Sequence, residues 1–249
     1  MISIRNLHKA FGRQVVLDGI SLEIPTGTTF SIVGPSGVGK SVLLKLIIGA
    51  MRPDAGEIYI EGKCITDART ERQKNEIRAS LGVLYQSAAL FDSLTVYDNV
   101  AFPLRERSRL KRAEVHRRVC EILDGLSLLR YSKRYPEEIS IGIRKRVGLA
   151  RALITEPKCV LIDEPNTGLD PYDGQQVYDL IVDCKSRWGF TGIVISHEIP
   201  EVFQVSDQVA MLLNGRIREC CSPEQLLSSE DAAVQQFVKG ETNGPIRIQ

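Results

Sequence analysis

Apolar residues along this chain fall into short separated runs, and the spacing within the runs alternates between strand-like and helix-like patterns. Residues 29–33, 159–162 and 191–195 are continuous apolar runs, which are typical of strands buried on both faces. Residues 42–48 and 172–187 carry apolar side chains at helical spacing. This alternation predicts an α/β fold in which a mainly parallel sheet is covered by helices.

The two ends of the chain carry turn signals instead. Residues 2–33 are predicted to form short antiparallel strands, with turns at Gly12, Gly19 and residues 25–27. Near the other end, an Asn-Gly pair at residues 214–215 separates two apolar runs and predicts a hairpin. An N-terminal antiparallel β part is therefore expected beside the parallel core.

The middle of the chain shows no strand signal between residues 96 and 129, where charged residues recur with helical spacing. Residues 139–153 also read as a helix. We therefore expect an α-helical subdomain, at about residues 87–156, inserted in one domain that spans residues 1–240. Residues 241–249 form a C-terminal extension in this interpretation.

The bulk composition narrows the choice of function. With 32 basic and 31 acidic residues the net charge is +1, so the overall charge does not favour nucleic acid as a partner. The six cysteines form no C-x-x-C pair and are expected to be reduced thiols. The apolar runs are shorter than the ~18 residues needed to span a bilayer, so a membrane role requires a partner protein.

A phosphate-binding loop stands between the predicted strand at residues 29–33 and the helix that follows it. The segment fits the pattern G-x-x-x-x-G-K-[ST] at every fixed position. Glycines let backbone N–H groups turn toward phosphates, Lys40 would reach the outer phosphates, and the Ser41 hydroxyl would bind Mg²⁺. The predicted nucleotide-binding residues of this loop are Gly34, Pro35, Ser36, Gly37, Val38, Gly39, Lys40 and Ser41.

Two adjacent carboxylates, Asp163 and Glu164, follow the apolar run at residues 159–162. In P-loop ATPases the Asp holds Mg²⁺ and the following Glu polarises the water that attacks the γ-phosphate. The alternative is an ordinary acidic cap of the next helix, against which Pro165 and the upstream phosphate loop both argue.

With these two motifs, the chain resembles the nucleotide-binding subunit of an ABC transporter over essentially its whole length. The resemblance implies that Phe11 stacks on adenine and that His197 contacts the γ-phosphate. It implies that Gln86 senses Mg²⁺ and the γ-phosphate while contacting the membrane partner, and that Asp170 is the D-loop aspartate. The implied catalytic residues are Lys40, Gln86, Glu164 and His197, and the implied Mg²⁺ ligands are Ser41, Gln86 and Asp163.

The main departure of this chain from the family pattern is in the signature segment, which reads L-S-G-G-Q in the family. In the corresponding segment, Ile141 replaces the first Gly and Ile143 replaces the Gln, while Ser140 and Gly142 are retained. Ser140 and Gly142 are the residues expected to face the γ-phosphate bound by a second subunit. The two isoleucines are expected to affect the rate of ATP hydrolysis. The alternative interpretation is that the chain is a nucleotide-gated binding module that does not hydrolyse ATP.

Residues 85–106 and the end of the chain are similar to the Mla-type phospholipid-transport ATPases. This resemblance implies a homodimer that binds ATP with Mg²⁺ at the cytoplasmic face of the inner membrane, as a peripheral subunit. The implied partners are a polytopic permease, an MCE lipid-binding protein and a small STAS-domain protein. The extension, with Gly244–Pro245–Ile246, is expected to reach the other copy or the small partner as an extended arm.

Two other functions stay open. One is the ATPase subunit of another ABC system, such as lipoprotein release or amino-acid import. The other is a soluble ABC-type ATPase acting on DNA or ribosomes, for which a second nucleotide-binding domain or a long coiled-coil insertion is expected.

A further open point is the basic segment at residues 105–118, which is interpreted as a solvated helical face or as a contact with anionic headgroups or the permease.

Overall fold

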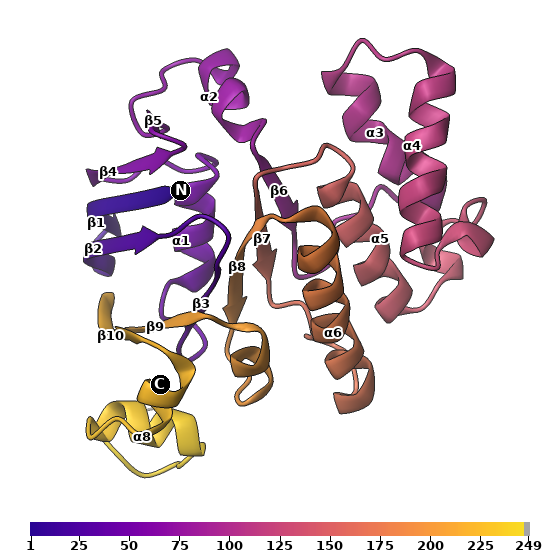
Figure 1. Ribbon diagram of the computed structural model, residues 1–249. Helices are drawn as coiled ribbons and strands as arrows, with labels where there is room; N and C mark the ends of the chain where they lie inside the picture. Colours follow the sequence, from indigo (N-terminus) through magenta and orange to yellow (C-terminus); the bar gives the residue numbers. More distant parts are fainter. Residues whose placement is uncertain (247–249) are drawn as a thin grey trace. The chain divides into compact units, whose positions relative to one another are not determined.

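The computed structural model describes residues 1–246 and divides the chain into two compact units (Figure 1). The phosphate-loop unit comprises Met1–Arg78 and the chain from Thr191 onward. The carboxylate unit comprises Ala79–Phe190. Over the described residues, no helix combines the length and the apolar character that crossing a membrane requires.

The first sheet of the phosphate-loop unit is antiparallel, with strand order β2-β1-β4-β5. Its strands are β1 (Ile2–Phe11), β2 (Gln14–Ile24), β4 (Ala55–Ile60) and β5 (Lys63–Cys64). The turn predicted at Gly19 is wrong, because Gly19 lies inside β2 with a φ of 76°. The pairing of β1 with β2 passes from Leu7 opposite Ile20 to His8 opposite Asp18, so Gly19 forms a bulge that only a φ-permissive residue adopts easily.

The second sheet of this unit contains the strands on either side of the phosphate loop. Its order is β10-β9-β3-β8, in which β3 is parallel to both β8 and β9. These strands are β3 (Thr29–Val33), β8 (Thr191–Ser196), β9 (Gln208–Leu213) and β10 (Arg216–Cys221). All five residues of β3 are buried, as its apolar run predicts. The predicted hairpin joins β9 to β10, and Asn214 and Gly215 both have positive φ in its turn.

The helices of this unit are α1 (Lys40–Ile47), α2 (Glu71–Arg78), α7 (Pro223–Leu227) and α8 (Ala232–Lys239), with a 3₁₀ turn, η3, at Glu201–Val205. The hydrophobic pattern does not reveal α2, because Ile77 is its only buried residue. Tertiary contacts anchor α2 instead, since Arg78 donates to the carbonyl oxygens of Ile48 and Gly49 at 2.6 and 2.8 Å.

The described part of the C-terminal extension folds back on α8. Gln236 of α8 is buried and its side-chain amide exchanges two hydrogen bonds with the main chain of Ile246, at 2.7 and 3.0 Å. The arm predicted at residues 246–248 lies largely outside the described residues. Its reach toward a second copy stays a prediction.

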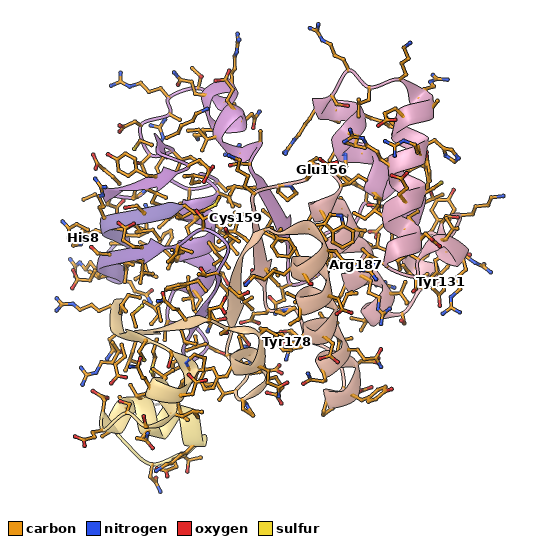
Figure 2. The ribbon with its side chains drawn as sticks, viewed as in Figure 1. His8, Tyr131, Glu156, Cys159, Tyr178 and Arg187 are labelled. Carbon is orange, nitrogen blue, oxygen red and sulfur yellow. The ribbon has the colours of Figure 1, made fainter. Side chains whose placement is uncertain are left out.

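The carboxylate unit pairs two parallel strands, β6 (Leu81–Leu84) and β7 (Cys159–Asp163). Between them the chain forms α3 (Val96–Arg107), α4 (Arg112–Gly125), η1 (Leu129–Tyr131), η2 (Pro136–Glu138) and α5 (Ile141–Leu153), and α6 (Pro171–Trp188) follows β7. The helix α3 packs against both α4 and α5. Tyr178 of α6 is fully buried and donates to the Asn166 side chain at 3.4 Å (Figure 2).

The predicted α/β class is confirmed, with an antiparallel N-terminal β part and helices between β6 and β7. The limits of the helical subdomain and of the C-terminal extension stay predictions. The six cysteines are all free thiols, and burial raises the pKa of Cys184 to about 12.

Candidate functional site

The phosphate-binding loop connects β3 to α1, and its glycines have backbone conformations that other residues rarely adopt. Gly34, Gly37 and Gly39 have φ values of 148°, 81° and 106°. A Cβ atom on Gly34 would lie 2.2 Å from the carbonyl oxygen of Leu212. The loop therefore packs directly on the main chain of β9, which explains why this position requires glycine.

Lys40 begins α1 and is 4% exposed. Its Nζ donates to the carbonyl oxygens of Gly34 and Pro35 at 2.7 and 2.9 Å, so the lysine side chain lies along the loop that it follows. Ser41, the next residue, is exposed. Among residues 1–246, Gly39 at the start of α1 makes no side-chain cap hydrogen bond, and the N–H groups of a helix N-terminus suit an anion.

Two other predicted residues belong to the same unit. Phe11 ends β1 and is 47% exposed, and the Lys9 ammonium lies 5.5 Å from the centroid of its ring. An exposed ring at a strand end offers a face for stacking, as predicted for adenine. His197 follows the last residue of β8 directly and is partly buried.

The carboxylate unit holds the remaining predicted residues. Asp163 is the buried last residue of β7, and Glu164 follows it with a φ of 45°, in the left-handed region. The Glu164 carboxylate accepts hydrogen bonds from the Gln86 amide and from the Thr167 hydroxyl, both at 3.1 Å. The structure thus brings Gln86 and Glu164 together across 78 positions of sequence.

Sequence reasoning missed two cations of α5 that donate to main-chain oxygens, one at the Gln86–Glu164 pair and one at the segment that follows Gln86. The buried Lys145 donates from Nζ to the carbonyl oxygens of Gln86 and Glu164. Burial lowers the pKa of Lys145, and the nearby carboxylates of Asp163 and Glu164 oppose that shift. Arg151 donates to the carbonyl oxygens of Ala88 and Ala89, each at 2.7 Å. The signal that could have revealed them is a cation at positions of α5 where the helical spacing predicts apolar, buried side chains.

The signature segment forms the start of α5. Ser140 is the N-cap residue, and its hydroxyl accepts from the N–H of Ile143 at 3.4 Å. Ile141 is 48% exposed at the first position of the helix, and Gly142 follows it. Asp170 is likewise an N-cap, of α6, where its carboxylate accepts from the N–H of Asp173 at 2.9 Å. The structure therefore gives Ser140 and Asp170 a local capping role that the resemblance did not predict.

The predicted metal ligands are all oxygen donors. Ser41 supplies a hydroxyl, Gln86 an amide carbonyl and Asp163 a carboxylate, which is a set that suits Mg²⁺. Ser41 lies in the phosphate-loop unit, whereas Gln86 and Asp163 lie in the carboxylate unit. Among the described residues, no group of three or more His, Cys, Asp or Glu side chains could hold a metal ion.

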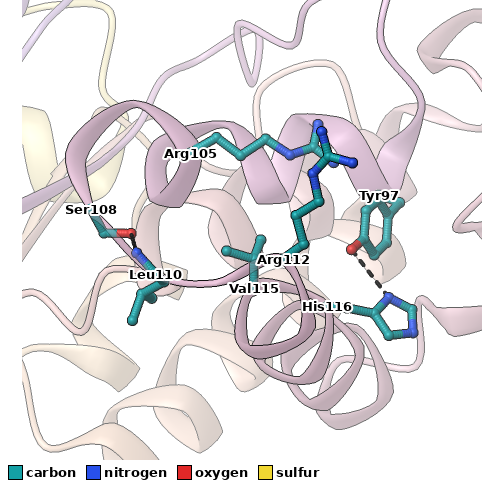
Figure 3. A pocket seen from close by; sticks show the side chains of 7 residues that line it. All are labelled: Tyr97, Arg105, Ser108, Leu110, Arg112, Val115 and His116. Carbon is teal, nitrogen blue, oxygen red and sulfur yellow. Dashed lines mark hydrogen bonds between the residues drawn. The ribbon is translucent and has the colours of Figure 1, made fainter.

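The basic segment lies on α3 and α4. A cavity of about 670 Å³ is lined by Tyr97 and Arg105 of α3, by Arg112 and His116 of α4, and by three further residues (Figure 3). Arg105 forms an ion pair with Asp98 at 2.8 Å. Arg117 and Arg118 both form ion pairs with Glu114, and their hydrogen bonds lower the pKa of Glu114 to about 2. Arg105, Arg117 and Arg118 of this segment are thus ion-paired, and its contact with headgroups or a permease stays a prediction.

Comparison with known proteins identifies relatives over the full chain. The ABC transporter family matches residues 17–167. The intermembrane phospholipid transport ATP-binding protein MlaF of Haemophilus influenzae is 36% identical over 249 residues, covering 100% of this chain and 94% of the relative. MlaF of Escherichia coli (strain K12) is 37% identical over 246 residues, covering 99% and 91%. The probable ribonucleotide transport ATP-binding protein mkl of Mycobacterium leprae is 40% identical over 245 residues, covering 98% and 70%.

Two solved structures are also similar. The ATP-binding cassette MJ0796, in a dimeric post-hydrolysis state bound to ADP and Pi, has a TM-score of 0.81 and 29% identity, and the match covers 90% of this chain and 99% of that one. The protein cbiO1 of Clostridium perfringens, part of the transporter complex cbiONQ, has a TM-score of 0.83 and 28% identity, with 92% and 91% covered.

Proposed function

Since the chain belongs to the ABC transporter family and is one of its ATPases, we propose that it powers a permease that moves phospholipid between the inner membrane and an MCE lipid-binding protein. The observation that carries the proposal is the similarity to two phospholipid-transport ATP-binding proteins over 91–94% of their lengths. The mycobacterial relatives are the basis for a second candidate cargo, ribonucleotides, although this chain spans only 70% of the Mycobacterium leprae relative.

The residues of the phosphate-loop unit fit the binding of ATP. Main-chain N–H groups of Gly34–Ser41, of which Pro35 has none, and the Lys40 ammonium would hold the phosphates, and Phe11 would stack on adenine. Ser41, Gln86 and Asp163 would hold Mg²⁺, which supplies positive charge to neutralise the phosphate oxygens. The exposed Ser41 and the uncapped start of α1 support this arrangement.

The residues of the carboxylate unit fit hydrolysis. Glu164 would accept a hydrogen bond from a water and orient its oxygen toward the γ-phosphorus. A new P–O bond forms as the bond from the γ-phosphorus to the bridging oxygen breaks, giving ADP and phosphate. Lys40 and His197 would stabilise charge on the transferred group. The bond from Gln86 to Glu164 supports this role, since it restrains the carboxylate.

A homodimer would complete the site. In it, Ser140 and Gly142 of one copy face the γ-phosphate held by the other copy, and Asp170 lies at the same interface. The exposed helix start at Ile141 and the dimeric state of the similar cassette support this proposal. Because Ile141 is β-branched and stands in place of a glycine, the approach of the helix to that phosphate is expected to be limited and the basal rate low.

A groove in the carboxylate unit supports the permease partner. This groove of about 310 Å³ lies beside the segment after β6 and is lined by Tyr85, Phe91 and Phe102 among others. The rings of Phe91 and Phe102 lie 4.8 Å apart, and both are exposed. An exposed aromatic surface next to Gln86 fits a segment of the permease.

The ATPase would then be a peripheral subunit at the cytoplasmic face of the inner membrane. In the same proposed assembly, the C-terminal extension would contact the other ATPase copy or the small STAS-domain partner.

The test is transport by the purified complex. We expect the tagged chain to co-purify with a permease and an MCE protein, and the reconstituted complex to transfer labelled phospholipid only with ATP and Mg²⁺. Glu164→Gln should retain ATP binding within about threefold while lowering turnover by a factor of about 10²–10³, equivalent to about 3–4 kcal/mol. Glu137→Gln, at an exposed glutamate of the same unit, is the matched control and should leave turnover unchanged.

Two outcomes would contradict the proposal. Turnover of Glu164→Gln equal to the wild type, in a preparation free of other ATPases, would remove Glu164 from the hydrolytic role. ATP-driven movement of ribonucleotides, without phospholipid transfer, would assign the second cargo instead.

A further inference from the structure

Lys145 is a buried cation that has no role in the function proposed above. It lies in the second turn of α5 and is 3% exposed. Removing an ammonium from water is costly unless its N–H groups find acceptors, and lysine has three such donors. Over residues 1–246 no carboxylate lies within ion-pair distance of its Nζ, so its direct partners are main-chain oxygens.

Those main-chain oxygens belong to the two residues that pair in the candidate site. Nζ of Lys145 donates to the carbonyl oxygen of Gln86 and, at 3.2 Å, to that of Glu164. The side chains of Gln86 and Glu164 also bond to each other, at 3.1 Å. One ammonium therefore ties together the main-chain positions from which both side chains project.

The main chain at Glu164 needs such support. Its φ of 45° is in the left-handed region, which costs free energy for a residue with a side chain and persists only where the surroundings hold it. The N–H of Thr167 also donates to its carbonyl oxygen, at a longer 3.4 Å. Lys145 thus supplies a charged donor to the main chain at a strained position.

The same face of α5 continues along the segment that starts at Gln86. An ideal Cβ on Gly148 would lie 2.7 Å from Cδ1 of Leu84 and 3.1 Å from Cβ of Ala88, so the helix approaches this segment closely. Arg151, further along, donates to the carbonyl oxygens of Ala88 and Ala89. Lys145 differs from these two residues because it also reaches Glu164.

We propose that Lys145 is a positioning residue for ATP hydrolysis, which holds the main chain of Gln86 and Glu164 so that their side chains stay paired and aligned. Because Lys145 lies on the helix that begins at Ser140, it also joins the signature segment to Gln86 and Glu164 through one rigid element. This inference rests on the proposed role of Glu164 in hydrolysis.

The test uses the full-length chain with saturating ATP and Mg²⁺. Lys145→Met removes the donors but retains a long side chain, and should lower kcat at least tenfold while the Kd for ATP changes less than threefold. Lys145→Arg, whose guanidinium can donate to two carbonyl oxygens, should recover most of kcat. Lys133→Met, at an exposed lysine of the same unit, is the control and should leave kcat unchanged.

Hydrogen exchange separates positioning from general stability. In Lys145→Met we expect faster exchange confined to residues 86–89 and 164–167. Wild-type kcat in this variant would overturn the inference, as would faster exchange throughout the carboxylate unit with no recovery in Lys145→Arg. If Lys145→Met does not fold, Lys145→Gln, whose shorter amide cannot reach both carbonyl oxygens, is held to the same outcomes.

Comparison with Glu164→Gln keeps the two proposals distinguishable. An inactive Glu164→Gln together with a fully active Lys145→Met would reject the positioning role and leave the proposed function intact. A fully active Glu164→Gln would instead reject the hydrolytic role on which the inference rests.

Discussion

The two units carry the candidate functional residues in different ways. The phosphate-loop unit offers mainly main-chain N–H groups from one continuous segment, Gly34–Ser41, in which every residue except Pro35 carries such a group. The carboxylate unit offers side chains from segments that are far apart in sequence, such as Gln86 and Glu164. A site built from one continuous loop is visible in the sequence, whereas a site built from separated side chains depends on packing.

The phosphate loop and the segments around Gln86 and Glu164 also differ in how they accommodate unusual backbone conformations. In the phosphate loop, the residues with positive φ are glycines, which adopt these values at little cost. In the carboxylate unit, Ala88, Ala89 and Glu164 have φ values of 60°, 45° and 45° although each has a side chain. Hydrogen bonds from Lys145 and Arg151 to their carbonyl oxygens hold these positions. Hydrogen bonds from a cation thus take the place of glycine at these three positions.

The largest effect is expected from breaking the close packing of the phosphate loop. In Gly34→Ala the new Cβ would meet the Leu212 carbonyl oxygen at 2.2 Å, so we expect ATP affinity to fall at least 100-fold and stability by about 2–3 kcal/mol. Isothermal titration and denaturant unfolding measure the two quantities.

Gly37→Ala is the matched control for Gly34→Ala. Gly37 also has positive φ, but no atom lies within 4 Å of its ideal Cβ, so the cost is conformational only, at about 1 kcal/mol. Equal losses in the two variants would show that loop conformation matters and that packing against β9 does not.

A smaller effect is expected from removing one side-chain bond in the carboxylate unit. Thr167 donates to the Glu164 carboxylate at 3.1 Å, and Thr167→Val deletes this donor at nearly constant volume. We expect kcat to fall about three- to tenfold, equivalent to about 0.7–1.4 kcal/mol. This is less than the full worth of a hydrogen bond to a charged group, about 1.5–3 kcal/mol, because Gln86 still restrains the carboxylate. Thr167→Ser, which keeps the hydroxyl, should retain the wild-type rate. Steady-state ATPase assays measure kcat for both variants. A fall in kcat in Thr167→Ser as large as in Thr167→Val would rule out the hydrogen bond as the cause.

The smallest effect concerns a surface carboxylate of the same unit. Bonds from Arg117 and Arg118 lower the pKa of Glu114 to about 2, below the usual value of 4.5. Because the pKa is lower in the folded state, the stabilisation is present above pH 4.5 and is lost as the pH falls toward 2. Glu114→Gln should therefore lower the Tm slightly at pH 7 and have no effect near pH 2.

Glu106→Gln, at an exposed glutamate of α3, is the control for this comparison and should leave the Tm unchanged at both pH values. A constant difference between wild type and Glu114→Gln from pH 7 to pH 2 would contradict the ion-pair explanation.

Much of the fold was predictable because it depends on local patterns. The buried runs at β3, β7 and β8 and the Asn-Gly turn before β10 form as the hydrophobic spacing and turn chemistry indicate. The prediction failed at Gly19, because a glycine in a bulge and a glycine in a turn have the same local signal. The helix α2 was missed for the opposite reason, since its anchoring by Arg78 is tertiary.

The sequence by itself determined the α/β elements, the phosphate-binding loop and the adjacent Asp163 and Glu164, because each of these depends on residues that are consecutive or regularly spaced. Only the tertiary structure decided that Gln86 bonds to Glu164 and that Lys145 is buried against the main chain of both. The reason is physical: these contacts arise when α5 packs close to the segment after β6, and no local pattern encodes which carbonyl oxygens a buried ammonium will meet.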